Sequence, residues 1–214
     1  MNFPNRVYID ISSYCNHKCI FCSNSDSRTV KSILSLDKFK KVLLNIMNHV
    51  EIKELGLYGK GEPFLNKDIL EFIRYAKNKK IDYVFITTNG TLLNEKISYE
   101  ILNSGLDSIK FSINALDKKE YFKIHGKDEF EKVLDNLCHI VQLKKTIFSK
   151  VKILISTINK NLNEEKVINF FITLLKDDFK YIDLIFYYPP GFTPKLSKKY
   201  LESIDLKNLC SRDI

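Results

Sequence analysis

The chain alternates between short apolar runs and longer stretches in which apolar residues recur every three or four positions. The short runs are rich in Ile, Val, Phe and Tyr, a composition that is typical of buried strands. They predict six strands, at residues 7–11, 54–58, 83–87, 108–113, 151–158 and 181–187. The periodic stretches predict helices between these strands, at residues 36–50, 69–76, 130–141 and 167–174.

Strands that alternate with helices predict an α/β fold with a parallel sheet and right-handed crossovers. This rhythm alone does not distinguish an open doubly wound sheet from a curved partial barrel. Residues 189–214 contain three prolines and a glycine close together, and they predict a loop followed by a modest helix. No stretch approaches the roughly 18 apolar residues of a membrane span, and the N-terminus lacks the pattern of a signal peptide. We therefore expect a cytoplasmic protein with no membrane partner.

Charge gives a weaker indication of function. The 214 residues include 34 Lys and Arg against 26 Asp and Glu, which gives a formal net charge of +8. Only four of the basic residues are arginines, and the lysines are spread along the chain. Proteins that bind nucleic acid usually cluster their basic residues and use arginine for paired contacts. The charge pattern is therefore that of a lysine-coated surface, and a nucleic-acid partner is not favoured.

Cysteine spacing is more informative. Five cysteines are an odd number, which argues against a disulfide framework in a cytoplasmic chain. Cys15, Cys19 and Cys22 fall within eight residues, and three thiolates so close together suit an iron–sulfur cluster with one iron left open. There are two alternatives to such a cluster. One is a zinc ion held by the three cysteines together with His17, and the other is three thiols that bind no metal. Cys138 lies on or beside the apolar face of the helix predicted at 130–141, where we expect it to pack in the core.

Polar, glycine-rich or thiol-bearing segments follow all six predicted strands. Because active sites of parallel α/β folds collect at the carboxyl ends of the strands, these segments predict the rim of one pocket. Three of the seven glycines, Gly56, Gly59 and Gly61, lie within six residues at the end of the second predicted strand, and glycine lets the backbone approach a ligand closely. Glu62 adds a negative charge that suits an ammonium group. The six segments are residues 15–22, 59–63, 87–90, 112–114, 156–159 and 187–190.

The order and spacing of these segments resemble the radical S-adenosylmethionine superfamily. The resemblance rests on Cys-x3-Cys-x2-Cys with Phe21 before the last cysteine, on Gly-Lys-Gly-Glu-Pro about forty residues later, and on Thr-Thr-Asn-Gly after that. It covers about residues 7–187 and is greatest to the branch that contains the molybdenum-cofactor enzyme and the SPASM-domain maturases. The resemblance implies a partial (βα)6 barrel at residues 1–188. Residues 189–214 would then be a C-terminal extension, either minimal or the start of a longer auxiliary domain.

The resemblance also implies cofactors and their ligands. Cys15, Cys19 and Cys22 would hold a [4Fe–4S] cluster, and S-adenosylmethionine would chelate its open iron. The chemistry that the resemblance implies is reductive cleavage of S-adenosylmethionine to a 5′-deoxyadenosyl radical. This radical then takes a hydrogen atom from a carbon of the substrate. Contacts to S-adenosylmethionine or its surroundings are implied for Phe21, Gly61, Glu62, Pro63, Thr88, Ser112, Asn114, Phe186 and Tyr187.

The implied partners are a small-molecule substrate, such as a sugar, or a peptide, and an electron donor of the flavodoxin or ferredoxin type. A partner protein that closes the open side of the barrel is a further expectation, because six βα units cannot complete a ring that normally takes eight. The sequence leaves two other functions open: a non-catalytic iron–sulfur redox or scaffold protein, and a zinc-binding module. No residue at the strand ends identifies the substrate.

Two features depart from the family pattern. The family often has an arginine where this chain has His125, before Gly126, and taken alone His125 would be a histidine of a surface loop. The SPASM branch continues into a cysteine-rich domain with auxiliary clusters, whereas here only Cys210 occurs in the corresponding region. A single cysteine cannot supply such a cluster, so we expect no auxiliary cluster in this chain.

Overall fold

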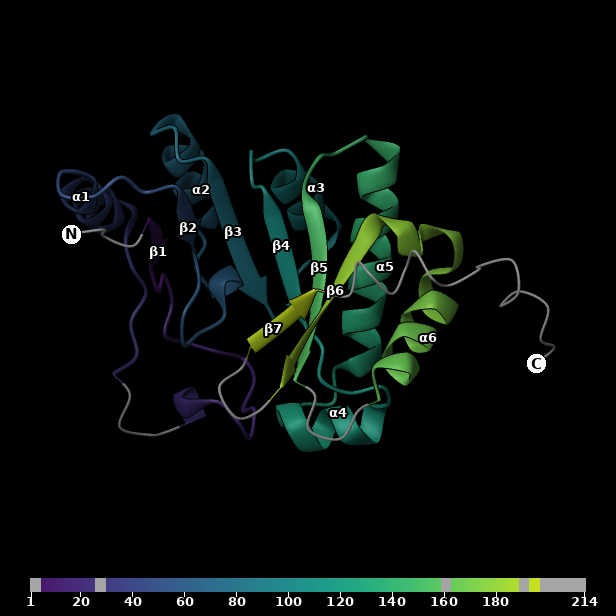
Figure 1. Cartoon of the computed structure of the whole chain (residues 1–214). Coiled ribbons are helices and arrows are strands. Elements are labelled where there is room, and N and C mark those ends of the chain that lie inside the picture. The colour runs from purple at the N-terminus through teal and green to yellow at the C-terminus, as the bar shows by residue number, and fades with distance from the viewer. Residues whose placement is uncertain (1–4, 26–29, 159–162, 189–192, 197–214) are drawn as a thin grey trace.

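The computed structural model describes residues 5–25, 30–158, 163–188 and 193–196. Its centre is one sheet whose seven strands lie side by side in chain order (Figure 1). The first six strands pair in parallel, and the seventh runs antiparallel to the sixth. The strands are β1 (Arg6–Tyr8), β2 (Glu54–Gly56), β3 (Tyr83–Thr88), β4 (Ser108–Ser112), β5 (Lys152–Ile158), β6 (Ile182–Tyr188) and β7 (Thr193–Leu196).

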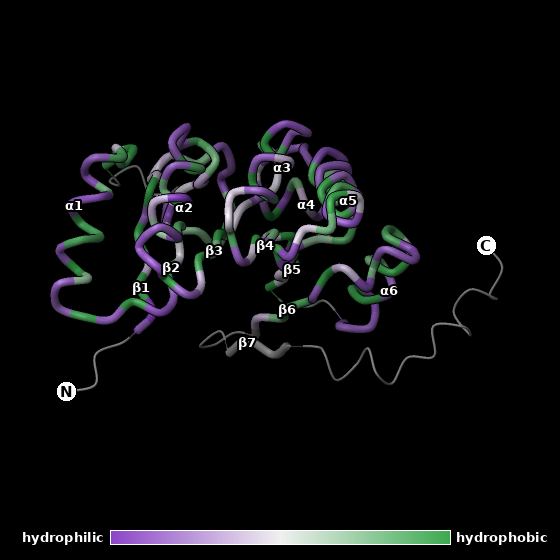
Figure 2. Tube along the Cα trace, turned by 90° about the horizontal axis from the view of Figure 1, so that it is seen from above, coloured by the Kyte–Doolittle hydropathy of each residue, from purple (hydrophilic) through white to green (hydrophobic). Residues whose placement is uncertain are grey.

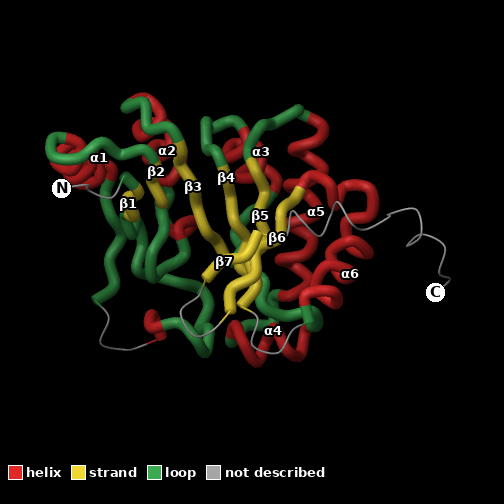
Figure 3. Tube along the Cα trace, in the orientation of Figure 1, coloured by secondary structure: helices red, strands yellow, loops and turns green. Residues whose placement is uncertain are grey.

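Six α-helices connect the parallel strands. They are α1 (Leu36–Met47), α2 (Ile69–Asn78), α3 (Glu95–Leu102), α4 (Lys118–His125), α5 (Phe130–Thr146) and α6 (Glu164–Leu175). Helices α1, α2, α3, α5 and α6 lie along the outer side of the curved row of strands, as Figure 2 shows, whereas α4 lies below the carboxyl ends of the strands in Figure 1. Figure 3 shows that the opposite, concave face is crossed only by β7 in the described part of the chain. None of these helices is long and apolar enough to cross a membrane.

The core lies between the sheet and the helices, and alternation along the strands explains why. In β3, Val84 and Ile86 are fully buried on the helix side, whereas Phe85 between them is half-buried on the concave side. Side-chain caps begin several helices, as predicted at Ser35, whose hydroxyl accepts the Lys38 N–H. Cys138 is partly buried and packs against this core, which confirms the interpretation from its position.

The predicted α/β fold, with six parallel strands in a curved sheet, is confirmed. Helices α3 and α4 were not predicted, because each has only eight residues and gives a weak periodic pattern. The prediction of a loop at residues 189–214 is wrong at Thr193–Leu196, which form β7. This four-residue strand contains Pro194, which sequence patterns read as a strand breaker, but an edge strand tolerates proline. The modest helix predicted after it lies outside the described residues.

Candidate functional site

The segment between β1 and α1 that contains Cys15, Cys19 and Cys22 is called the cysteine loop. It lies at the carboxyl edge of the sheet, beside the loop after β2 (Figure 1). The Glu62 N–H donates to the Tyr14 carbonyl at 2.7 Å, so the two loops share a backbone hydrogen bond. A Cβ atom on Gly61 would lie 1.9 Å from the Ser12 carbonyl oxygen and 2.4 Å from that of Tyr14. Only glycine allows this contact, and Gly61 therefore fixes how closely the cysteine loop approaches β2.

The Glu62 side chain faces the protein interior. It is buried, and its carboxylate accepts hydrogen bonds from the Thr88 hydroxyl (2.7 Å), the Asn89 N–H (2.9 Å) and the Phe64 N–H (3.2 Å). Burial raises the pKa of Glu62 to about 7, against these three hydrogen bonds, which lower it. Thr88 also accepts the Gly90 N–H at 3.0 Å. Glu62 and Thr88 thus join the loop after β2 to the end of β3, and their contacts with a ligand stay predictions.

Amide side chains attach the cysteine loop to the turn after β3. The Asn89 amide donates to Asn16 Oδ1 at 2.8 Å, and the Asn16 amide donates to Thr91 Oγ1 at 2.7 Å. The Thr91 N–H and hydroxyl both donate to Asn89 Oδ1, at 3.0 and 2.7 Å. Because these groups are buried or half-buried and each has a partner, the network holds Asn16, next to Cys15, in one position.

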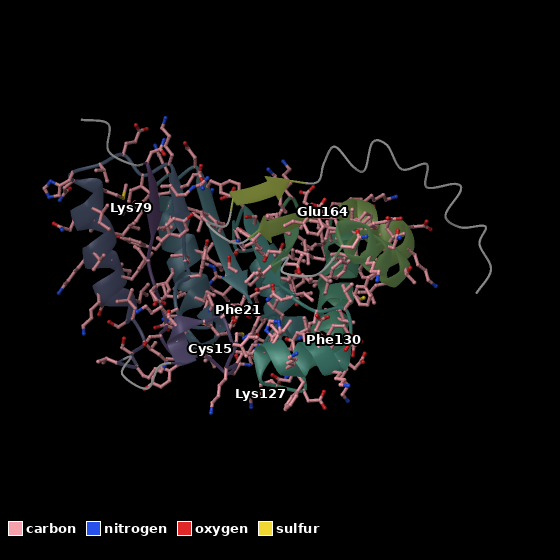
Figure 4. The ribbon with its side chains drawn as sticks, turned by 60° about the horizontal axis from the view of Figure 1, so that its bottom comes forward. Cys15, Phe21, Lys79, Lys127, Phe130 and Glu164 are labelled. Atoms are coloured by element: carbon pink, nitrogen blue, oxygen red, sulfur yellow. The ribbon has the colours of Figure 1, made fainter. Side chains whose placement is uncertain are left out.

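On its other side the cysteine loop pairs with the end of α4. The Lys18 N–H donates to the His125 carbonyl at 3.0 Å, and the Ile20 N–H donates to that of Ile124 at 2.9 Å. Helix α4 ends here because Gly126 adopts the left-handed conformation, with φ +68°. Figure 4 shows this loop, with Cys15 and Phe21 labelled, next to α4.

Two imidazoles fill the space between the loop and α4. His125 is 1% exposed and stacks on Tyr121 with ring centroids 4.2 Å apart. The reading of His125 as a surface loop histidine is therefore wrong, because α4 places it at the helix end that faces the loop. His17 Nε2 lies 3.0 Å from Glu129 Oε2. Burial lowers the pKa of His125 to about 3 and that of His17 below its usual value.

Each of the three cysteine sulfurs lies close to a nitrogen that carries or can carry a proton. The backbone N–H of His17 donates to Cys15 Sγ at 3.4 Å, and the backbone N–H of Asn24 donates to Cys22 Sγ at 3.5 Å. Cys19 Sγ lies 3.3 Å from His125 Nδ1. Burial raises the pKa of Cys19 to about 12, with a smaller contribution from the charges of the other two thiolates.

This donor set fits an iron–sulfur cluster. Three thiolates that repel one another need a cation between them, and N–H groups directed at ligand sulfurs are a common feature of such clusters. The ligand atoms of His17, Cys19 and His125 also lie within 4.8 Å of one another, which a single metal ion could use. Both imidazoles already contact protein groups, whereas Cys15 and Cys19 form no disulfide in the described part of the chain.

The site residues predicted on β4 also lie at this edge of the sheet. Asn114 is buried, and its amide nitrogen lies 3.3 Å from the half-buried Ser112 hydroxyl. Phe21 is 43% exposed and lies edge-on to the His125 ring at 6.2 Å. Pro63 is buried as the first residue of a short 3-10 helix. The structure brings Phe21, Pro63, Ser112 and Asn114 to the end of the sheet that holds the cysteines, and their roles stay predictions.

Residues of β6 occupy a different part of the sheet. The Phe186 side chain is buried among the core residues, and that of Tyr187 lies on the concave face. Their backbone runs between β5 and β7, where Phe186 pairs with Thr157 and Lys195. A contact of this backbone with adenine stays a prediction.

The concave face carries aromatic rings around one lysine. Lys110 on β4 donates to the Tyr187 hydroxyl at 2.8 Å, and its ammonium lies 5.8 Å from the Tyr58 ring and 5.1 Å from the Tyr187 ring. Tyr8 and Phe85 extend this aromatic surface. Among the described residues, no carboxylate forms a salt bridge with Lys110. An ammonium so placed is available to an anionic ligand.

Sequence reasoning missed Asn16, Glu129 and the role of His125. Their partners lie 75, 112 and 106 positions away in the chain, so spacing could not reveal them. The one signal was His125 itself, which departs from the family pattern at a position before a glycine.

A curved parallel sheet with three thiols at its carboxyl edge defines a metal-binding α/β protein. The chain matches the family described as the radical SAM superfamily over residues 9–189, and it belongs to that superfamily. It is therefore an enzyme of the class that uses a [4Fe–4S] cluster and S-adenosylmethionine.

Curated relatives of this chain include proteins named probable GTP 3′,8-cyclase. A probable GTP 3′,8-cyclase of Sulfurisphaera tokodaii is 29% identical over 177 residues, which are 82% of this chain and 55% of the relative. A probable GTP 3′,8-cyclase of Thermococcus kodakarensis is 31% identical over 163 residues, 76% of this chain and 50% of the relative. The chain thus spans about half the length of these curated relatives.

Solved structures share the fold. Streptococcus suis SuiB bound to S-adenosylmethionine has a TM-score of 0.69 at 21% identity, and the match covers 98% of this chain and 47% of that one. BtrN in complex with AdoMet and 2-DOIA has a TM-score of 0.54 at 18% identity, with 86% of this chain and 70% of that chain covered.

Proposed function

We propose that this chain removes a hydrogen atom from a substrate carbon with the help of a [4Fe–4S] cluster held by Cys15, Cys19 and Cys22. The observation that carries this proposal is the loop itself, which places three sulfurs at the carboxyl edge of the sheet. Two of them accept backbone N–H groups, and the third lies 3.3 Å from His125 Nδ1. When bound, the cofactors supply one electron and, from S-adenosylmethionine, a 5′-deoxyadenosyl radical.

The chain's own residues position that chemistry. Gly61 allows the loop after β2 to lie against the cysteine loop, so that backbone groups there reach the amino and carboxylate groups of S-adenosylmethionine. The Ser112 hydroxyl faces the same side of β4 as Lys110 and offers a hydrogen bond to the ribose or methionine part. Phe21, exposed beside the loop, offers its ring to the adenine.

For the substrate, we infer a small molecule with an anionic group, bound on the concave face. Lys110 supports this choice, because its half-buried ammonium has an aromatic surrounding and no described acidic partner. The curated relatives are named for GTP, which is an anionic small molecule. SuiB was solved with its precursor peptide SuiA, which makes a peptide the second candidate.

The proposal also includes the partners and boundaries expected from the resemblance. Residues 1–188 form the catalytic core, and residues 189–214 form an extension of it. A flavodoxin- or ferredoxin-type protein delivers the electron. The uncovered concave face leaves room for a partner protein or a further segment to shield the radical from water.

Cluster and activity are tested together under anaerobic conditions. The reconstituted chain should hold close to four irons and produce 5′-deoxyadenosine from S-adenosylmethionine and dithionite. Cys19→Ala should lose most of the iron and the product, because two thiolates hold the cluster poorly. Cys138→Ala is the matched control, since Cys138 packs on the core away from the loop and should retain both. Stoichiometric zinc without a brown chromophore would contradict the proposal.

A second experiment tests the substrate class. GTP is the first probe, and it should increase 5′-deoxyadenosine formation in the wild-type chain. Lys110→Met should abolish that increase, whereas Lys96→Met, on the exposed side of α3, should retain it. An increase with peptides and with no anionic small molecule would show that the inferred substrate class is wrong.

A further inference from the structure

His125 lies between one predicted cluster ligand and the ends of β4 and β5. Its Nδ1 atom is 3.3 Å from Cys19 Sγ, and its Nε2 atom is 3.4 Å from the side-chain nitrogen of Asn114. The residue is 1% exposed, so protein groups rather than bulk water have to satisfy both ring nitrogens. Which of the two nitrogens carries the proton decides what the imidazole does to Cys19.

The backbone of β5 fixes the orientation of the Asn114 amide. The Ile158 N–H donates to Asn114 Oδ1 at 2.8 Å. Because a backbone N–H can only donate, the amide oxygen has to face Ile158 and the NH2 group has to face the other way. That NH2 group has two hydrogens and two neighbours, the Ser112 hydroxyl at 3.3 Å and His125 Nε2.

The amide orientation in turn fixes the imidazole. An amide NH2 group donates and does not accept, so the Nε2 atom of His125 has to accept and carries no proton. In a neutral imidazole the proton is then on Nδ1, which points at Cys19 Sγ. A series of hydrogen bonds thus begins at the Ile158 backbone, passes through Asn114 and His125, and ends at a sulfur.

We propose that His125 is a positioning residue that donates a hydrogen bond from Nδ1 to the Cys19 sulfur and thereby raises the reduction potential of the cluster. This inference rests on the proposed function, because it requires a cluster at Cys19. Hydrogen bonds to ligand sulfurs withdraw negative charge and stabilise the reduced state, which makes a cluster easier to reduce.

The other two sulfurs show why His125 has a separate role. Cys15 and Cys22 accept N–H groups of the backbone two residues further along, which almost any residue there would supply. The donor at Cys19 is a side chain from a different element, α4. Of these three contacts, it is the one that a single substitution removes while the backbone stays in place.

The first test reads the proton on His125 directly and needs no cluster. Nitrogen-15 NMR of the full chain without iron should show a protonated Nδ1 and an unprotonated Nε2 for His125. In Asn114→Asp the aspartate accepts from Nε2, so the proton should move to that nitrogen. A wild-type spectrum with the proton on Nε2 would overturn the inference, and so would an Asn114→Asp spectrum in which Nδ1 keeps it.

The second test measures the potential of the cluster in the reconstituted full chain by EPR-monitored redox titration. In His125→Phe, which retains a ring beside Tyr121 but no N–H, the ratio of reduced to oxidised cluster at a fixed potential should fall on the order of tenfold, about 59 mV for one electron. His125→Asn retains a donor near the Nδ1 position and should stay closer to wild type.

The outcomes of the redox titration distinguish failure of this inference from failure of the proposed function. A His125→Phe chain with full iron and the wild-type potential would overturn the inference. If that variant does not bind iron, His125→Gln replaces it, because the Gln oxygen can accept from Asn114 near the Nε2 position and no donor remains at the Nδ1 position beside Cys19. A wild-type chain that binds no cluster would contradict the proposed function, while the NMR experiment would still decide the state of His125.

Discussion

The cysteine loop is held on two sides, and the two sides differ in chemistry. On the amide side, formed by Asn16, Gly61, Glu62, Asn89 and Thr91, buried groups with matched partners join the loop to β2 and β3. On the imidazole side, two histidines join it to α4 and the start of α5.

The two sides differ in whether all their buried polar groups have hydrogen-bond partners. On the amide side, the side chains of Asn16, Glu62, Asn89 and Thr91 are all hydrogen-bonded, and the close backbone approach at Gly61 leaves no room for adjustment. On the imidazole side, His17 Nδ1 is buried and has no hydrogen-bond partner among the described residues, and the partner of Nε2, Glu129, is 27% exposed. The amide side is therefore the more completely hydrogen-bonded attachment of the loop. The imidazole side, where Lys18 and Ile20 also pair with the backbone of α4, places His125 beside Cys19 and adjusts the electronic surroundings of that sulfur.

The largest expected effect comes from removing the close approach on the amide side. Gly61→Ala would place a methyl group 1.9 Å from the Ser12 carbonyl oxygen, so one of the two loops has to move. We expect a loss of about 3 kcal/mol or more in the free energy of unfolding, measured in urea, together with loss of iron on reconstitution.

Gly105→Ala is the control for Gly61→Ala. Gly105 also needs glycine, because its φ is +88°, but a Cβ atom there would meet only Lys77 Cγ at 3.4 Å. That substitution should cost about 1 kcal/mol and leave the iron content unchanged. Equal losses in the two variants would show that the contact between the loops does not hold the site.

Next in size is the pH dependence that Glu62 gives to the amide side. Its pKa is raised from 4.5 to about 7, so the folded chain binds this proton more tightly than the unfolded chain does. Stability from this group is therefore greatest at low pH and falls as pH rises from about 4.5 to 7, by about 3 kcal/mol in total.

Urea unfolding of the chain without iron at pH 5 and pH 7 measures this slope. Glu62→Gln does not titrate and should remove this fall between the two pH values. The exposed Glu71→Gln should retain it. A wild-type slope that persists in Glu62→Gln would assign the pH dependence to other groups.

The amide side also shows how far sequence reasoning reaches. Gly61, Glu62 and Thr88 were found because they lie in short motifs at strand ends, where a parallel sheet gathers its chemistry. Their partners were not found: the sequence suggested an ammonium ligand for Glu62, whereas the structure shows Thr88 and Asn89.

The imidazole side could not be predicted in the same way. His125 belongs to an eight-residue helix with a weak periodic pattern, and its contacts with Cys19 and Asn114 depend on how α4 packs against the loop. The strands, in contrast, gave strong local patterns, because β2 to β6 carry buried apolar residues. The sequence thus predicts the sheet and the candidate cluster ligands. The tertiary contacts between motifs that are far apart in the chain require the structure.

A medium effect is expected when the amide network loses its central member. Asn89→Ala would leave Asn16 Oδ1 and both donors of Thr91 without their partner. Unpaired buried polar groups are costly, so we expect a loss of about 2 kcal/mol in urea unfolding. Asn103→Ala, on the exposed end of α3, should cost less. Similar losses in the two variants would contradict the importance of the network.

The smallest effect is expected on the imidazole side, from Glu129→Gln. The glutamine oxygen can still accept the hydrogen bond from His17 Nε2, and the lost charge is partly screened because Glu129 is 27% exposed and close to Lys132. We expect a change below about 0.5 kcal/mol in urea unfolding, with iron content unchanged. Glu129→Ala removes the acceptor and leaves both nitrogens of the buried His17 ring unpaired, which should cost about 1–3 kcal/mol. If Glu129→Gln instead costs as much as Asn89→Ala, the imidazole side fixes the loop as firmly as the amide side does, and the contrast between the two sides fails.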